Sequence, residues 1–132
     1  MWDGINRRRF PRVNYPCYIR VCKKKSHIDF LAHSKQRSHQ EFLTQTENIS
    51  CGGIAVAIEK KLELFEAVEL KMDLKDSGPL IECDGTIVWV VKRTIPQEPK
   101  HISFDTGVEF TNLAKKDEAR VDAIVQRLMK QE

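Results

Sequence analysis

Apolar and polar residues alternate along much of the chain, which predicts a fold built mainly from short strands. The clearest example is residues 68–74, where Val68, Leu70, Met72 and Leu74 are separated by charged residues. Successive side chains of a strand point to opposite faces, so this segment is expected to bury one face. The same pattern predicts five further strands, at residues 17–21, 41–47, 54–59, 80–92 and 102–110.

The longest predicted strand, residues 80–92, leads to two further expectations. Its alternation puts Trp89 and Val91 on the inward face, so Trp89 is expected in the core. Gly85 falls on the same face, where a glycine indicates a bulge or a sharp bend. The segment that follows, residues 93–101, contains two prolines and is expected to be a loop.

The C-terminal segment has a helical period instead. Val121, Ile124, Val125, Leu128 and Met129 recur at the spacing of an amphipathic helix. About six short strands followed by one helix indicate a mainly β fold, either a small barrel or a sandwich, capped by the helix. The order of elements contains no βαβ alternation, so a parallel-sheet nucleotide-binding fold is not supported.

The composition is typical of one folded, soluble domain. The chain has 132 residues, of which 41% are apolar and 31% are charged. No apolar run approaches the roughly 20 residues that span a bilayer, and none follows the N-terminal charges as in a signal peptide. We therefore expect a cytoplasmic protein without membrane insertion. The four cysteines form no CxxC pair and the histidines lack metal-binding spacing, which predicts free thiols, no metal and no cofactor.

Positive charge is concentrated near the N-terminus. Residues 1–40 carry ten Lys and Arg but two Asp and Glu, whereas residues 41–132 carry twelve and seventeen. This asymmetry favours an anionic partner for the N-terminal part of the chain.

Within that part, the segment NRRRFPRV contains an RxxxR pattern. Arg8 and Arg12 form the pattern, and Arg7 and Arg9 flank it. A guanidinium group fits a phosphate or the O6 and N7 edge of guanine, and its plane can stack on a base. Taken alone, the arginines are also compatible with a solvated basic tail.

A second candidate site is the segment NISCGG. Asn48, Ser50 and Gly53 form an NxSxxG pattern, with Gly52 adjacent. Asn and Ser side chains bond nearby backbone groups and paired glycines permit positive φ, so a turn is expected. The amide, the hydroxyl and the exposed backbone would offer hydrogen bonds to a flat polar ligand, although an ordinary turn has the same composition.

Together the two patterns resemble the PilZ domain family. The matching segments are RRRFPRV, NISCGGIAV, GTIVWVV and GVEFTNL, and the resemblance extends over roughly residues 6–130. It implies a small six-stranded antiparallel β-barrel with a C-terminal α-helix and a flexible basic N-terminal arm. The expected boundaries are residues 1–14 for the arm, 15–113 for the barrel and 114–132 for the helix.

The resemblance implies a bacterial receptor for cyclic di-GMP. In that family the RxxxR arginines hold a phosphate and a guanine edge, and the turn motif contacts a guanine. Carried over to this sequence, the ligand-binding residues are Arg8, Arg12, Asn48, Ser50 and Gly53, with support from Arg7, Arg9 and Gly52. Asn48 stands where the family often has aspartate, and without the full charge its bond to guanine N–H donors should be weaker.

The expected mechanism is closure of the arm over the ligand, which changes the interactions with a downstream protein partner in motility or biofilm regulation. The basic connection 23–40 is a candidate contact for such a partner. The alternative is a PilZ-like adaptor that binds protein but no nucleotide. Nucleic-acid binding is disfavoured because no exposed aromatic platform is evident, and an enzyme is not expected because no catalytic motif is present. The pattern leaves the oligomeric state open.

Overall fold

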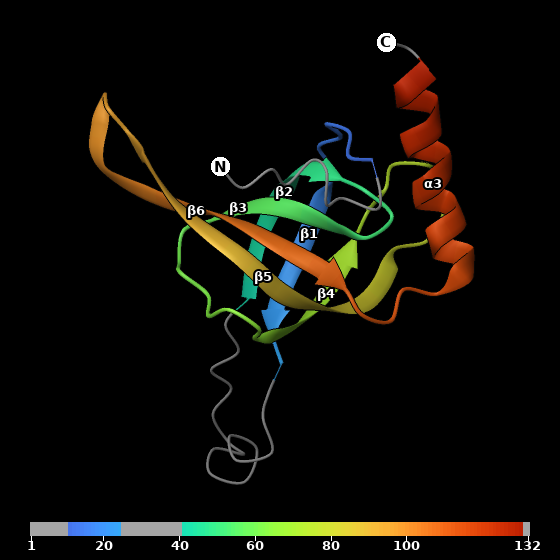
Figure 1. The fold of residues 1–132 in the computed structure, drawn as a ribbon, viewed down its shortest axis with the longest axis horizontal. Helices are drawn as coiled ribbons and strands as arrows, with labels where there is room; N and C mark the ends of the chain where they lie inside the picture. The colour runs from blue at the N-terminus through green and yellow to red at the C-terminus, as the bar shows by residue number, and fades with distance from the viewer. Residues whose placement is uncertain (1–10, 25–40, 131–132) are drawn as a thin grey trace, which may run out of the picture.

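The computed structural model describes residues 11–24 and 41–130 and forms a closed barrel (Figure 1). The six strands pair in the order β1-β2-β3-β6-β5-β4, and every pairing is antiparallel. A helix, α3, follows them. This confirms the expected mainly β fold and rules out the sandwich. The elements are β1 (Tyr18–Lys23), β2 (Glu41–Ile49), β3 (Gly53–Ile58), β4 (Ala67–Met72), β5 (Ile81–Ile95), β6 (Glu98–Phe110) and α3 (Lys115–Lys130).

The barrel interior is filled by the residues that the alternation assigns to it. Val68, Leu70 and Met72 of β4 are fully buried, while the charged residues between them are exposed. In β1, Ile19 and Val21 are likewise buried. These positions are predictable because a barrel strand has one dry face and one wet face.

The distal part of β5 corrects the expectation for Trp89 and Val91. The bulge lies between Ile87 and Trp89, whereas Gly85 keeps regular register with both neighbouring strands. The extra residue reverses the alternation, so Val90 packs against the core while Val91 is 55% exposed and Trp89 is only half-buried.

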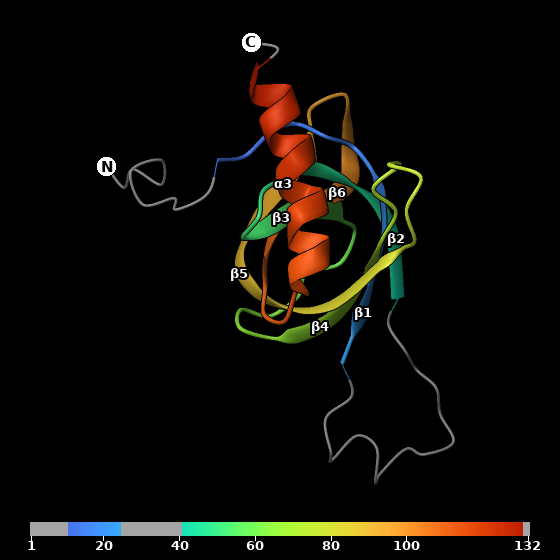
Figure 2. The ribbon, with the colours of Figure 1, turned by 90° about the vertical axis from the view of Figure 1, so that its right-hand side faces the viewer.

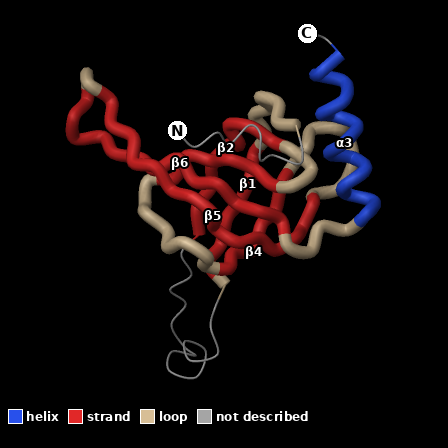
Figure 3. Tube along the Cα trace, viewed as in Figure 1, coloured by secondary structure: helices blue, strands red, loops and turns tan. Residues whose placement is uncertain are grey.

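Residues 93–101 are not the expected loop. β5 continues to Ile95, a tight turn follows at residues 96–97, and β6 begins at Glu98. The two strands form a long hairpin that projects beyond the barrel (Figures 1 and 3). The prolines were misleading because one lies in the turn itself and the other near the start of β6.

Helix α3 lies across one open end of the barrel (Figure 2). Val121, Ile124 and Val125 are buried, as the helical spacing predicts, whereas Met129 at the end of the stripe is exposed. Arg120 anchors the helix by donating to both carboxylate oxygens of Asp76, at 2.7 and 2.9 Å. This hydrogen bonding lowers the pKa of Asp76 to about 2.

Candidate functional site

The turn between β2 and β3 is organised by the buried side chain of Ser50. The Ser50 hydroxyl oxygen accepts hydrogen bonds from the backbone N–H groups of Gly52 (3.1 Å) and Gly53 (3.2 Å). The Ser50 N–H donates to the Gly53 carbonyl at 2.9 Å. The hydroxyl is therefore committed to holding the turn in shape, and its contribution to a site is to fix the backbone around it.

The glycines of the turn are required for a reason other than the positive φ that the sequence led us to expect. No glycine in the described part of the chain has positive φ. Gly53 is required instead by close approach, because a Cβ at this position would collide with the Val108 carbonyl oxygen of β6. The Gly52 carbonyl accepts a hydrogen bond from the Phe110 N–H at 2.9 Å, so β6 contacts the turn at both Gly52 and Gly53.

The chain that follows the N-terminal arm is fastened beside this turn. Val13 and Ile49 exchange two backbone hydrogen bonds, of 3.0 and 2.9 Å, as an isolated antiparallel bridge. Arg12 precedes Val13, and Ser50 follows Ile49, so the bridge sets the exposed Arg12 next to the turn. Two segments far apart in sequence thus meet at one place.

Three of the predicted arginines, Arg7, Arg8 and Arg9, lie outside the described residues. Their roles in the site therefore stay predictions. Arg12 is the only member of the RxxxR pattern whose position relative to the turn is known.

Asn48 belongs to a row of paired residues that runs across four strands. It pairs with Ala55 on β3, which pairs with Gly107 on β6, which pairs with Trp89 on β5. The Asn48 side chain makes no hydrogen bond within the described part of the chain and so keeps its donors and acceptors available.

Trp89 is the site residue that the sequence pattern missed. Its indole lies directly over Gly107, where any Cβ would collide with the ring. The pattern assigned Trp89 to the core because it assumed unbroken alternation, and no residue type at positions 87–89 marks the bulge. The pairing of a large aromatic residue with a glycine in the neighbouring strand is the signal that could have identified it.

Next to this row lies a charged cluster formed by Glu47, Arg93 and Asp105. The Arg93 Nη2 atom lies 2.7 Å from Asp105 Oδ2 and 3.2 Å from Glu47 Oε2. Burial, followed by the nearby Asp105 carboxylate, raises the pKa of Glu47. The Arg93 guanidinium thus holds two acidic side chains from two different strands.

The turn also touches helix α3. The Cys51 thiol lies 3.7 Å from the Asp122 carboxylate oxygen. Burial and the negative charge of Asp122 raise the pKa of Cys51 to about 11, so this thiol is protonated and unreactive at neutral pH. The turn and the helix are therefore in contact through these two side chains.

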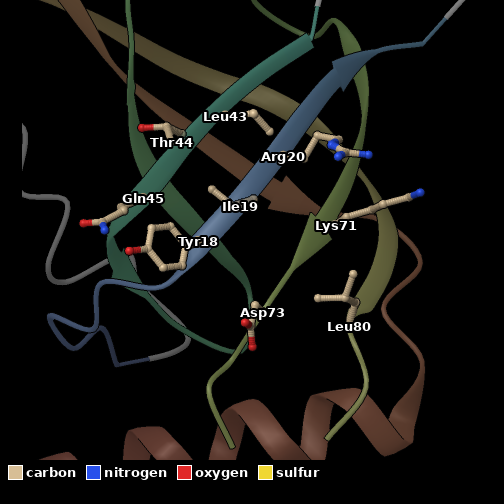
Figure 4. Close-up of a pocket in the computed structure, with 9 residues that line it drawn as sticks. All are labelled: Tyr18, Ile19, Arg20, Leu43, Thr44, Gln45, Lys71, Asp73 and Leu80. Atoms are coloured by element: carbon tan, nitrogen blue, oxygen red, sulfur yellow. The ribbon is translucent and has the colours of Figure 1, made fainter. Parts of the chain in front are cut away.

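A separate hollow of about 730 Å³ lies on the outer side of β1, between β2 and β4 (Figure 4). Tyr18, Leu43 and Leu80 contribute exposed apolar surface, and Arg20 and Lys71 lie side by side as partners in neighbouring strands. The lining residues come from β1, β2, β4 and the connection between β4 and β5, and none of them belongs to the β2–β3 turn. The hollow is therefore a second surface.

The described ranges contain no cluster of three or more His, Cys, Asp or Glu side chains that could hold a metal ion. All four cysteines are free. Within the same ranges, none of the helical structure is long and apolar enough to cross a membrane.

Comparison with solved structures identifies chains of the same fold. MotI/DgrA, the inhibitor of motility of Bacillus subtilis, has a TM-score of 0.66 at 18% identity over 95% of this chain and 53% of its own. MrkH of K. pneumonia in complex with c-di-GMP has 0.68 at 18% identity, over 94% and 52%. The PilZ domain of YcgR from Escherichia coli with c-di-GMP has 0.64 at 15% identity, over 95% and 93%.

The chain thus spans about half the length of MotI/DgrA and MrkH and nearly all of the isolated YcgR domain. No curated protein gives a significant match by sequence. The model of one family, the PilZ domain, matches residues 6–127, which include both the arginine segment and the β2–β3 turn. The chain belongs to the PilZ domain family.

Proposed function

We propose that this protein is a receptor for cyclic di-GMP that has no catalytic activity of its own. The observation that carries the proposal is the Val13–Ile49 bridge, which sets Arg12 beside a preorganised turn with an available Asn48 amide. The complexes of MrkH and of the YcgR domain with c-di-GMP support the choice of ligand.

Each part of the site would meet a different part of the ligand. Arg8 and Arg12 would hold a phosphate and a guanine edge, because guanidinium groups bind both in forked geometry. Asn48 would hydrogen-bond a guanine from the barrel surface, and the Gly53 position would let the ligand approach the backbone. Arg7, Arg9 and Gly52 would add secondary contacts. Ser50 would act by shaping the turn, since its hydroxyl already accepts two backbone N–H groups.

Binding would close the arm, residues 1–14, onto the barrel of residues 15–113. A cyclic dinucleotide carries two negative charges and would offset part of the positive charge of the four arginines of the arm, which repel one another without it. The ordered arm would then present a new surface to a downstream protein, and the contact between Cys51 and Asp122 would carry the change to the helix of residues 114–132. We expect this to occur in the cytoplasm, in motility or biofilm regulation, since the structural neighbours include an inhibitor of motility.

Substitution of the arginines tests the proposed clamp, in which Arg8 and Arg12 of the arm hold the ligand against the barrel. Arg8→Ala and Arg12→Ala should each weaken cyclic di-GMP binding by about 2–5 kcal/mol, or roughly thirtyfold to several thousandfold, because each removes a charge-assisted contact. Isothermal titration calorimetry measures the change. Arg127→Ala on helix α3 is the matched control, because it removes an exposed arginine far along the chain from both motifs and should leave affinity unchanged.

Less than a threefold loss in both arm variants would overturn the clamp. An equal loss in Arg127→Ala would attribute binding to general charge instead.

The second candidate function is a PilZ-like adaptor that binds protein without nucleotide. The hollow on the outer side of β1 favours it, because Tyr18, Leu43 and Leu80 expose apolar side chains around one concave surface. An adaptor would show no heat of binding with cyclic di-GMP while remaining folded.

A further inference from the structure

The distal half of β5 has an open edge on the side where β4 pairs with its first half. β4 pairs with β5 only from Ile81 to Thr86, and the β3–β4 connection contacts Ile87 through two backbone hydrogen bonds. From Val88 to Ile95, no described residue pairs with this edge, although β6 pairs with the other edge as far as Ile95. The open edge is therefore eight residues long, and alternate residues along it direct their backbone N–H and C=O groups away from β6.

The first half of this edge has the apolar composition of a strand that pairs with neighbours on both sides. Residues 88–91 read Val-Trp-Val-Val, with no proline and no charge, and Val88 and Val91 are both exposed. Exposed strand edges usually carry proline or charged residues, which discourage pairing with another chain. The open edge of β6 follows that rule, since Pro99 and Lys100 lie within it. On the β5 edge the charged residues, Lys92 and Arg93, lie in the distal half, so residues 88–91 are the part without proline or charge.

A strained residue stands at the base of the same edge. Phe65 has φ of 65°, which is unusual for a bulky residue, and its side chain is 75% exposed. Its N–H donates to the Ile87 carbonyl at 2.7 Å, so the Phe65 backbone is held beside the start of the open edge. Strain at an exposed aromatic residue is commonly retained where the residue serves recognition.

We propose that this edge is a dimer interface, in which β5 of one copy pairs antiparallel with β5 of a second copy. Antiparallel pairing of one edge with itself has two-fold symmetry, so it covers both edges and ends at a dimer. A second copy supplies a strand of the same length, open on the required side. The interface needs no nucleotide, and it includes Trp89, which lies in the same row of paired residues as Asn48 of the proposed ligand site.

The register follows from the pleat and from charge. Opposite residues of a strand pair must lie on the same face of the sheet. One residue must therefore lie opposite the same residue of the other copy, with the two-fold axis between them. An axis at Lys92 would set two lysines opposite each other, which is unfavourable. An axis at Val91 instead sets the two Val91 residues opposite each other, Arg93 opposite Trp89, and Lys92 opposite Val90, so that no like charges lie directly opposite.

Cross-linking tests the register directly. Opposite residues of an antiparallel pair have Cα atoms about 4.5–5.5 Å apart, within the range that a disulfide spans. Val91→Cys should therefore form a disulfide-linked dimer when the protein is oxidised with copper phenanthroline. Leu43→Cys is the matched control, because Leu43 is 73% exposed but lies in the hollow on the outer side of β1. Both are compared with the wild-type protein, which accounts for the native cysteines.

Analytical ultracentrifugation without nucleotide tests the interface itself. The wild-type protein should show a concentration-dependent dimer, and Val91→Lys should weaken it at least tenfold because it sets two lysines on the axis. Leu43→Lys should behave as wild type. A wild-type protein that stays monomeric up to about millimolar concentration would overturn the proposal. So would a dimer weakened by Leu43→Lys and not by Val91→Lys, because the hollow would then be the interface.

Discussion

At the residue scale, glycines and a tryptophan shape the candidate site by how closely they let strands approach. Gly53 and Gly107 both stand where a side chain would collide, the first with the β6 backbone and the second with the Trp89 indole. Neither close approach can be predicted from the alternation of apolar and polar residues, in which a glycine indicates only a bulge or a turn. The residue identities of the turn were predictable, but the reason for Gly53 was not, because the strand that crowds it lies 55 residues further along the chain.

Gly53→Ala should destabilise the protein by about 1–3 kcal/mol, because the backbone of β6 must move to admit the methyl group. Chemical denaturation measures the loss in the free energy of unfolding. Gly52→Ala is the neighbouring control and should cost less, since Gly52 faces β6 through its carbonyl oxygen. Equal losses at both positions would contradict a specific close approach at Gly53.

Trp89 should report ligand binding through its fluorescence. It lies on the outer side of the barrel in the same row as Asn48, so a bound nucleotide would change its surroundings. The titration with cyclic di-GMP is best made in a Trp2→Phe background, which leaves Trp89 as the sole tryptophan of the chain. An unchanged emission spectrum at ligand saturation would remove Trp89 from the site.

At the scale of elements, the strands with unbroken alternation were predictable and the irregular ones were not. β4 follows its pattern throughout because both its ends lie in the closed barrel. β5 departs from the pattern at the bulge after Ile87, where it begins to leave the barrel, and its hairpin with β6 replaces the loop expected from two prolines. Such a departure is set by tertiary pairing, which a local pattern does not contain.

Helix α3 is held in place by an ion pair whose strength depends on pH. The pKa of Asp76 is lowered from 3.8 to about 2 by its hydrogen bonds with Arg120. A carboxylate with a lowered pKa stabilises the fold above its unfolded pKa and loses that contribution as pH falls through the folded pKa. The pair should therefore contribute fully above about pH 5, and its contribution should decline as pH falls from about 4 to 2.

Asp76→Asn should reduce the free energy of unfolding by about 0.5–1 kcal/mol at pH 7, as expected for a partly exposed ion pair. The difference between variant and wild type should shrink in denaturation experiments at pH 4, 3 and 2. Asp73→Asn is the matched control, because Asp73 forms no salt bridge with a described residue. A difference for Asp76→Asn that stays constant down to pH 2 would contradict this account.

At the scale of the whole molecule, the barrel separates several surfaces. The β2–β3 turn with Arg12 lies on one part of it, the apolar hollow lies on the outer side of β1, and the open β5 edge projects beyond it. The arrangement of strands followed from the family resemblance, but the proximity of Arg12 to the turn required the Val13–Ile49 bridge, which no sequence pattern indicates.

We propose above all that the site binds cyclic di-GMP selectively. The most direct test is isothermal titration calorimetry of the wild-type protein with cyclic di-GMP, alongside GMP and a single-stranded RNA. We predict saturable binding of cyclic di-GMP, weak or no binding of GMP, and no salt-steep binding of RNA. Absence of binding by cyclic di-GMP to the folded protein, or binding of RNA that is steeply salt-dependent and indifferent to sequence, would contradict the account.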